Sequence, residues 1–551
     1  MDTNLITYLK EFLKKNDLDG LLVNSTNEYL VEYNKLELNS RYYLTDFTGS
    51  TGDVLFTQDK IYLFVDSRYH EQADNQVNHD LIEVVKIPLK KSYINTLLET
   101  IPAYFKLGIV SSKVSKIFFG GLENNLKSKN SSIRLLNTDP VIEYNKDKIP
   151  NINFDIFKIP EDISGLSADE KYETIKLYAG DKFNIIVNSL EDIAYLTNLR
   201  SYSFDYSSIF PAKAIITQEK ATIYSDCEIP EIGTHFEVKS NKEFEKDLSE
   251  IKNDEIYVDN STISIHDFML INPSNKLLPS RLNLFKTVKN ENEINHFKEC
   301  FKRSDKALIR IYDMLNEDKI YSEYDYYEAL VEAMEKEGAK SLSFKPIVAG
   351  GSNSSIIHYT MPTKDKMIRD GDFLLVDYGG YYEGGYATDT TRTFIKGIPS
   401  ENQKIAYTTV LKAFLNAYNK EYKKKSAYFD IDKTARDTIE KSISEEYKFA
   451  HSTGHGVGIS VHEHPPIVSS TKISQTKIIE HTIFSIEPGV YKEGWGGIRL
   501  ENTVYAEQKE DKMIMHSFSH FPFEIKLVNL SMLTDWEKYY YMKWQAEACV
   551  L

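Results

Sequence analysis

The sequence predicts a protein of mixed α/β and α+β class, with two similar α/β domains in tandem and a third domain after them. Three observations lead to this prediction: a weak internal repeat, a pair of amphipathic helices after it, and short apolar strands with glycine-rich turns in the last third. A chain of 551 residues also exceeds what one hydrophobic core usually supports. We place the domains at 1–148, 149–285 and 286–551.

The internal repeat shares the order helix, apolar strand, polar turn, helix and strand hairpin. The motif LVNS at Leu22–Ser25 matches IVNS at Ile186–Ser189, and a hairpin that turns at Gln58 is matched by one at Gln218. The periodic pattern is interrupted near Pro150, which indicates a boundary between the two repeats. Chance matches between short strands are common, but agreement in the order of several elements favours a duplication.

Two helices are expected at the start of the third domain. A long amphipathic helix is predicted over residues 290–315, where apolar residues recur at helical spacing. Ser322 and Asp325 together form a capping pattern for a second helix, which Gly338 would end.

Charge and hydropathy narrow the classes of function. The formal net charge of −16 disfavours nucleic-acid binding, which depends on attraction to phosphates. No run of about 18 uncharged apolar residues is present, so we expect no membrane-spanning helix. Charged residues interrupt the first segment, which predicts an amphipathic helix and not a signal peptide. Its apolar residues are Leu5, Leu9, Phe12 and Leu13.

Cysteine usage favours a reducing, cytoplasmic location. The three cysteines show no pairing rhythm and none lies in a CxxC motif, so neither a disulfide framework nor a thiolate zinc site is expected. They are Cys227, Cys300 and Cys549.

Four carboxylates and a histidine in the third domain form a candidate metal site: Asp377, Asp389, His455, Glu487 and Glu501. Each acid stands at the end of an apolar strand. One such acid is usually a solvated edge residue, but four that converge would repel one another unless divalent cations offset their charge. Two divalent cations would balance four carboxylates and one neutral imidazole. Oxygen-rich ligation suits manganese, cobalt or iron better than a structural zinc ion.

Three further histidines stand in the same segments. His358, His451 and His462 are, on their own, equally consistent with ordinary polar residues, and their roles stay open at this point.

These segments resemble the pita-bread metallopeptidases of family M24. The motifs VDYGG, TDTTRTF, HSTGHGVGISVHEHPP, SIEPGVY and GIRLENTVY are similar to those of the three-domain aminopeptidase P type. The resemblance extends to DSRYHEQA, LEDIAYLTNLR and FPFEIKLVNLSMLT, and so covers nearly the whole chain. It implies two tandem creatinase-like N-terminal domains followed by a pita-bread catalytic domain with a C-terminal extension.

The resemblance also implies a role for each site residue. The five candidate residues would hold two metal ions, most often Mn²⁺ in this family, with Co²⁺, Zn²⁺ or Fe²⁺ possible. Asp389 and Glu501 would bridge the ions, Asp377 and Glu487 would flank them, and His455 would hold one ion.

The same resemblance implies the catalytic groups. Glu487 would also act as general base. His358 and His462 would contact the scissile peptide, steadying the oxyanion and helping to protonate the leaving nitrogen. His451 and Arg499 would line or support the substrate pocket.

The implied activity is hydrolysis of the bond between an N-terminal residue and a proline at position two, by a hydroxide that bridges the metals. The partners would be such peptides, with neither nucleic acid nor membrane. A homodimer through the catalytic domain is implied by the family alone.

Three alternatives compete with this activity. Prolidase shares the ligands, but it usually shows HDVG after the histidine motif and a longer gap between its glutamates than Glu487 to Glu501. Methionine aminopeptidase would leave the N-terminal half unexplained. A metal-free binding module, or creatinase-like chemistry without metal, is disfavoured because all five ligand types are retained.

One departure from the family pattern lies between Asp377 and Asp389, where this chain has one residue more than usual. The extra residue falls among Tyr381–Tyr386, and Gly384 and Gly385 can absorb it as a bulge in a turn. We therefore expect a longer turn and not the loss of a ligand.

Overall fold

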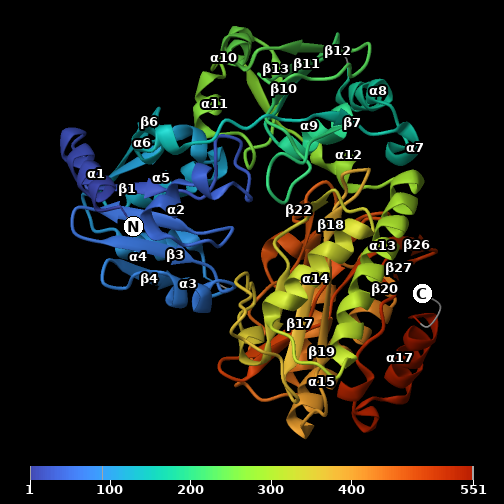
Figure 1. Ribbon diagram of the computed structural model, residues 1–551. Coiled ribbons are helices and arrows are strands. Elements are labelled where there is room, and N and C mark those ends of the chain that lie inside the picture. The colour runs from blue at the N-terminus through green and yellow to red at the C-terminus, as the bar shows by residue number, and fades with distance from the viewer. Residues whose placement is uncertain (1, 90, 181, 549–551) are drawn as a thin grey trace. The chain divides into compact units, whose positions relative to one another are not determined.

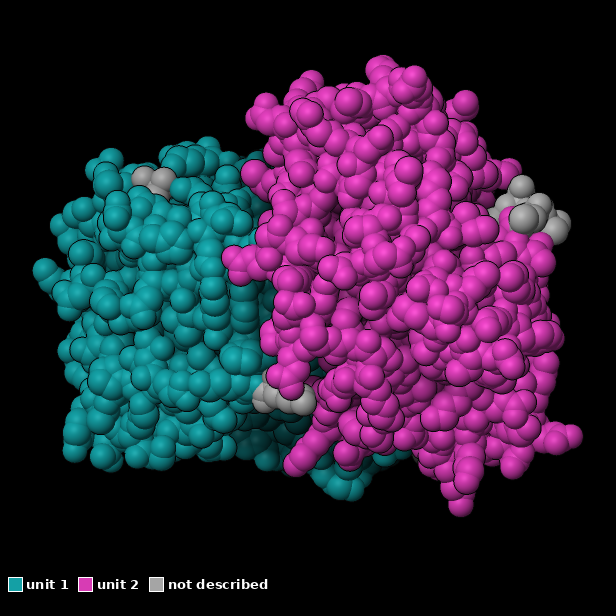
Figure 2. Space-filling model, turned by 90° about the horizontal axis from the view of Figure 1, so that it is seen from below, with its two compact units in different colours: residues 1–158, 166–205, 209–282 teal, residues 159–165, 206–208, 283–551 magenta. Residues whose placement is uncertain are grey.

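The computed structural model describes residues 2–89, 91–180 and 182–548. The chain divides into two compact units, which Figure 2 colours separately. The first unit comprises residues 1–158, 166–205 and 209–282, and the second comprises 159–165, 206–208 and 283–551.

The first unit contains two six-stranded sheets with the same topology. Their strand orders are β4-β3-β2-β1-β5-β6 and β12-β11-β10-β8-β13-β14. In the first sheet β1 pairs antiparallel with β2 and parallel with β5. In the second sheet β8 pairs antiparallel with β10 and parallel with β13. The predicted tandem duplication is therefore confirmed. The strands of the first sheet are β1 (Gly20–Val23), β2 (Asp53–Thr57), β3 (Ile61–Val65), β4 (Ile82–Lys86), β5 (Lys106–Val110) and β6 (Ser132–Leu136), and those of the second are β8 (Asn184–Val187), β10 (Lys213–Thr217), β11 (Ala221–Tyr224), β12 (Phe236–Lys239), β13 (Glu255–Val258) and β14 (Lys276–Pro279).

The repeated hairpins close in the same way. The amide of Thr57 donates to the carbonyl of Lys60 at 2.9 Å, and the amide of Thr217 donates to the carbonyl of Lys220 at 2.9 Å. The predicted turns at Gln58 and Gln218 lie inside these two closures.

Helices cover the sheets of the first unit (Figure 1). The predicted N-terminal helix forms as α1 (Thr3–Lys15), which buries Leu5, Leu9 and Leu13 on one face. The other helices are α2 (Ser40–Thr45), α3 (His70–Gln76), α4 (Tyr93–Thr100), α5 (Lys116–Lys127), α6 (Pro140–Tyr144), α8 (Ala168–Ala179), α9 (Leu190–Thr197), α10 (Asn241–Glu250) and α11 (Ile265–Leu270), and a two-stranded ladder joins β7 (Phe157–Lys158) to β9 (Leu199–Arg200).

The second unit contains the two helices expected from the sequence. α13 (Glu291–Asn316) and α14 (Glu323–Lys336) follow the short helices α7 (Glu161–Ser164) and α12 (Asn283–Thr287). The predicted cap of α14 forms, with the Asp325 amide donating to Ser322 Oγ and the Ser322 amide donating to Asp325 Oδ2. In Figure 1 both helices lie along β17 and β19.

The strands of the second unit form a three-stranded sheet, a six-stranded sheet and two two-stranded ladders. The three-stranded sheet is β16 (Ile347–Gly350), β17 (Phe373–Tyr378) and β19 (Thr390–Ile395), and the six-stranded sheet is β20 (Tyr422–Lys423), β27 (Lys512–Ser517), β26 (Asn502–Lys509), β23 (Ile483–Ile486), β21 (Gly454–Gly456) and β22 (Glu463–Val468). The ladders pair β15 (Ser341–Leu342) with β18 (Gly380–Tyr381) and β24 (Gly489–Lys492) with β25 (Gly496–Arg499). The remaining helices are α15 (Glu401–Asn419), α16 (Tyr428–Glu440) and α17 (Asp535–Ala548).

A buried arginine joins the two larger sheets of this unit. Arg392 of β19 donates to the carbonyl of Glu501 at 2.7 Å, to Asn502 Oδ1 at 2.9 Å and to the carbonyl of Phe521 at 2.8 Å. The guanidinium is completely buried, so these acceptors replace the water it has lost. Arg392 thereby fixes the start of β26 against β19.

A buried ion pair fixes β22 to the segment ahead of α13. Lys289 Nζ lies 2.5 Å from Glu463 Oε1, and the two side chains are 1% and 2% exposed. The second oxygen of Glu463 accepts from the amide of Ile459 at 3.0 Å, and Lys289 Nζ also donates to the carbonyl of Lys286. The pair is therefore both desolvated and fully hydrogen-bonded.

Two further sequence predictions concern the cysteines and membrane-spanning helices. Cys227 and Cys300 are free thiols, whereas Cys549 lies outside the described residues. None of the helices in the described ranges combines the length and the apolar run that crossing a bilayer requires.

Lys289→Met should lower the free energy of unfolding of the second unit by about 3–5 kcal/mol, because it leaves the Glu463 carboxylate buried without a partner. Adding Glu463→Leu should recover much of this loss, since a paired apolar replacement removes the stranded charge. Urea denaturation followed by tryptophan fluorescence measures both, because all three tryptophans, at 495, 536 and 544, belong to this unit.

The matched control is Lys512→Met, which breaks a pair with Glu421 whose side chains are 47% and 60% exposed. This loss should stay below about 1 kcal/mol. Equal losses in Lys289→Met and the control would contradict a structural role for the buried pair.

Candidate metal centre

Two of the predicted ligands stand side by side where β23 and β26 meet. Ile486 pairs with Asn502 in the last step of the antiparallel ladder, Glu487 follows β23, and Glu501 precedes β26. The two glutamates therefore leave neighbouring strands at the same end of the sheet.

The two aspartates come from the facing three-stranded sheet. Asp377 lies in β17 opposite Thr391 of β19, and Asp389 directly precedes β19. The longer connection between them turns where the Gly385 amide donates to the carbonyl of Tyr382, with Gly385 at a φ of 65°. The connection thus turns within the predicted segment, and Asp377 lies close enough to Asp389 to raise its pKa.

His455 enters the site from β21, between two glycines that permit close packing. A Cβ on Gly454 would lie 1.9 Å from the carbonyl oxygen of Ser485, and one on Gly456 would lie 2.2 Å from that of Glu463. Nδ1 of His455 lies 3.1 Å from the carbonyl of Gly456, which can only accept, so this nitrogen carries the proton. The Nε2 lone pair is then available to a cation.

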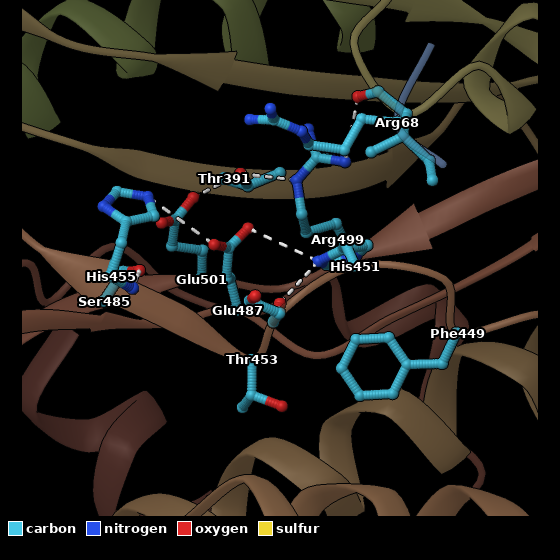
Figure 3. Close-up of polar contacts among 12 residues, drawn as sticks. Arg68, Thr391, Phe449, His451, Thr453, His455, Ser485, Glu487, Arg499 and Glu501 are labelled. Carbon is cyan, nitrogen blue, oxygen red and sulfur yellow. Dashed lines mark hydrogen bonds and ion pairs between the residues drawn. The ribbon is translucent and has the colours of Figure 1, made fainter. Parts of the chain in front are cut away.

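The ligand atoms converge on one centre (Figure 3). His455 Nε2 lies 3.5 Å from Asp389 Oδ2 and 3.6 Å from Glu487 Oε1. Ligand atoms of Asp389, His455 and Glu501 all lie within 4.8 Å of one another. In Figure 3 the side chains of His455, Glu487 and Glu501 point toward each other.

The cluster is electrostatically costly without cations. Burial, together with Glu501, Asp377 and Glu487, raises the pKa of Asp389 well above its ordinary value. Burial, Glu487 and Asp377 do the same to the pKa of Glu501. These carboxyl groups resist ionisation in one another's presence, which is the situation that divalent cations relieve.

Unpaired oxygens at the same place test whether cations fit. Asp377 Oδ1 and Glu501 Oε1 are buried and have no hydrogen-bond partner within the described part of the chain. A buried carboxylate oxygen without a donor is unfavourable unless a cation completes it. The donor set of carboxylates and one imidazole therefore fits divalent metal ions.

Arg499 orients the carboxylates of Asp377 and Glu501. It donates to Asp377 Oδ2 at 2.6 Å and to Thr391 Oγ1 at 3.2 Å, and Thr391 donates to Glu501 Oε2 at 2.6 Å. Each of these two acids thus has one oxygen held by the protein and one left over. Such outer contacts fix the orientation of metal ligands.

A second branch of the network runs from Arg499 to His451. Arg499 donates to the Tyr491 hydroxyl at 2.8 Å, and that hydroxyl lies 2.9 Å from His451 Nε2. His451 Nδ1 lies 2.7 Å from the carbonyl of Ser452, so it donates there, and Tyr491 must donate to Nε2. His451 Nδ1 is also 3.9 Å from Glu487 Oε2.

The structure places the other predicted site residues beside this cluster. The ring of His462 meets the ring of His455 edge-on, with centroids 4.5 Å apart. His358 is half-buried, and the carbonyl of its neighbour Ile357 accepts from Arg499 at 3.3 Å. The sequence did not single out Tyr491, although it lies in the quoted motif SIEPGVY.

Comparison with known proteins agrees with the geometry. Residues 295–508 match the model of metallopeptidase family M24. Residues 6–144 and 148–293 match two models of the creatinase/prolidase N-terminal domain. The predicted fold class, two creatinase-like domains ahead of a pita-bread domain, is therefore confirmed.

Two relatives are similar to this chain over nearly its whole length. A probable Xaa-Pro aminopeptidase P of Coprinopsis cinerea is 29% identical over 577 residues, covering 96% of this chain and 92% of the relative. Xaa-Pro aminopeptidase 1 of Dictyostelium discoideum is 29% identical over 567 residues, covering 96% and 89%.

A solved structure shares the fold over almost the entire chain. The X-prolyl aminopeptidase of Caenorhabditis elegans, described as a cytosolic enzyme with a di-nuclear active site, superposes with a TM-score of 0.91. It covers 99% of this chain and 95% of its own at 19% identity. The chain belongs to metallopeptidase family M24, with two creatinase/prolidase N-terminal domains ahead of its M24 domain.

Proposed function

We propose that this protein is an Xaa-Pro aminopeptidase, which hydrolyses the bond between the first residue of a peptide and a proline at position two. The observation that carries the proposal is the buried convergence of Asp389, His455 and Glu501, with Asp377 and Glu487 close by. The relatives named Xaa-Pro aminopeptidase, matched over nearly their full lengths, support the proline-directed specificity.

Two divalent ions, most often Mn²⁺ in this family, would be held by the five predicted ligands. Asp377, Asp389, His455, Glu487 and Glu501 would each provide a ligand to these ions. When bound, the ions supply Lewis-acid chemistry, which lowers the pKa of a water molecule and polarises the substrate carbonyl.

The chain's own groups would move the protons. Glu487 would take the proton of the attacking water as general base. His462 and His358 would hold the scissile peptide and help to protonate the leaving proline nitrogen, which carries no hydrogen before cleavage. His451 and Arg499 would support the pocket through the Tyr491 hydroxyl.

The proposal extends to organisation and location. We also propose domain limits at 1–148, 149–285 and 286–551, and a homodimer formed through the M24 domain. A cytoplasmic location is supported by the free thiols of Cys227 and Cys300 and by the nematode enzyme described as cytosolic.

A panel of peptides tests the specificity. With Mn²⁺, the protein should release only the first residue from a long Xaa-Pro-Xaa peptide, and a chelator should abolish this release. Preference for an Xaa-Pro dipeptide would indicate prolidase instead, and release of methionine from a Met-Ala peptide would indicate methionine aminopeptidase. No turnover under any condition would indicate a binding module.

Glu487→Gln should lower kcat at least about 100-fold while much of the bound metal remains, because the amide can ligate but cannot accept the proton of water. Mass spectrometry of bound metal and peptide turnover are measured on the same preparation. Activity close to that of the unmodified protein would remove Glu487 from the role of base.

Metal affinity should rise with pH. The raised pKa values of Asp389 and Glu501 keep these carboxyls protonated to higher pH in the metal-free protein, and each must lose its proton to bind a cation. Lowering the pH through these pKa values should therefore weaken Mn²⁺ binding. Calorimetric titrations in two buffers of different ionisation enthalpy should show protons released on binding, and binding without proton release at neutral and acidic pH would contradict the shifts.

A further inference from the structure

A buried carboxylate at the start of α14 holds the loop that carries His358. Glu323 is completely buried. Its Oε1 accepts from the Gly350 amide at 2.7 Å and from Asn353 Nδ2 at 3.0 Å. Its Oε2 accepts from the Tyr359 hydroxyl at 2.7 Å and from the Thr363 amide at 3.4 Å.

All four donors belong to one loop, residues 350–363, and they lie on both sides of His358. Asn353 also donates to the Tyr359 hydroxyl at 3.1 Å, which closes a small ring of hydrogen bonds around the carboxylate. Glu323 therefore draws together parts of the loop that are distant along it. A single acceptor with several donors restricts such a loop more than separate pairwise contacts would.

The residues that flank His358 are held from two directions. On one side, the Ile357 carbonyl accepts from Arg499, which also contacts Asp377. On the other side, the Tyr359 hydroxyl donates to Glu323. The backbone of His358 is thus fixed between the network behind the carboxylate cluster and the buried carboxylate of α14.

Gly350 packs closely against the side chains of Ile368 and Glu323. A Cβ on Gly350 would lie 2.0 Å from Cδ1 of Ile368 and 3.3 Å from Oε1 of Glu323. A side chain at this position would therefore displace Ile368 and crowd the carboxylate of Glu323. The α14 terminus is also tied to the end of the loop, because the Glu323 amide donates to the carbonyl of Lys366 at 2.9 Å.

Burial raises the pKa of Glu323 even though its four donors lower it, so the charged form is not fully compensated. An apolar side chain in its place would avoid this cost, but it would leave the four donors without their acceptor. The carboxylate therefore sets the loop geometry through directed hydrogen bonds, which filling the space alone would not do.

We propose that Glu323 is a positioning residue for catalysis, which acts through the Tyr359 hydroxyl and the loop 350–363 to hold His358 against the scissile peptide. The inference rests on the proposed aminopeptidase function and extends it to a residue that touches neither metal nor substrate. A displacement of His358 by about 1 Å is enough to lower the rate about 100-fold.

The test is a double-mutant cycle between Glu323→Gln and His358→Ala, measured with a long Xaa-Pro-Xaa peptide in the presence of Mn²⁺. Glu323→Gln keeps the shape but replaces one accepting oxygen by an NH₂ group. It should lower kcat about 100-fold with little change in KM and with unchanged bound metal. In the His358→Ala background the same change should cost less than about twofold, because its target is already gone.

Two further variants guard against a general loss of structure. Tyr359→Phe removes only the hydroxyl that links Glu323 to the residue after His358, and it should lower kcat about tenfold at an unchanged melting temperature. Asp267→Asn is the matched control, because Asp267 is a buried carboxylate that accepts from Lys213 Nζ at 2.7 Å and from Asn188 Nδ2 at 2.8 Å. Neither partner belongs to a loop with a site residue, so kcat should change less than about twofold.

The outcomes distinguish the positioning role of Glu323 from the proposed aminopeptidase activity. Losses that add in the His358→Ala background, or equal losses in Glu323→Gln and Asp267→Asn, overturn the positioning role while leaving the aminopeptidase intact. An unmodified protein without proline-directed activity contradicts the proposed function and the inference with it.

Discussion

Mutual repulsion among four carboxylates, three of them buried, is the constraint on which the rest of the M24 domain depends. Asp377, Asp389, Glu487 and Glu501 come from two different sheets, and burial and proximity raise the pKa values of Asp389 and Glu501 well above their ordinary range. A fold that brings such groups together is unfavourable unless cations are part of its functional state. Asp377 Oδ1 and Glu501 Oε1 have no hydrogen-bond partner among the described residues, and they indicate where those cations would bind.

The surrounding structure holds the ligands in place against this repulsion. Arg392 fixes the backbone at Glu501, and Arg499 holds one oxygen of Asp377 directly and one of Glu501 through Thr391. The protein thus neutralises part of the cluster with a buried guanidinium and leaves the remaining oxygens for metal. The same arginine reaches the carbonyl beside His358, so the ligand network and the proposed substrate groups share one support.

The sequence was most informative where the signal is local. Helix periodicity and capping predicted α1 and α14, and repeated strand and turn patterns predicted two sheets of equal topology. Motifs that resemble those of family M24 predicted that the four acids and His455 share one site, and each acid lies at or beside a strand end. The supporting contacts escaped prediction for a physical reason. Glu323 and Tyr359, or Lys289 and Glu463, are far apart in sequence, and no periodic pattern marks a pair that only the tertiary fold brings together.

The central claim is that the five ligands form one site for two cations, and titration of the metal-free protein with Mn²⁺ tests it most directly. Mass spectrometry under native conditions counts the ions bound to each chain. We expect two ions in the unmodified protein and at most one tightly bound ion when the predicted ligand Glu501 is changed by Glu501→Gln. Fewer than two ions at saturation, or two ions bound equally tightly by the variant, would contradict a shared dinuclear site.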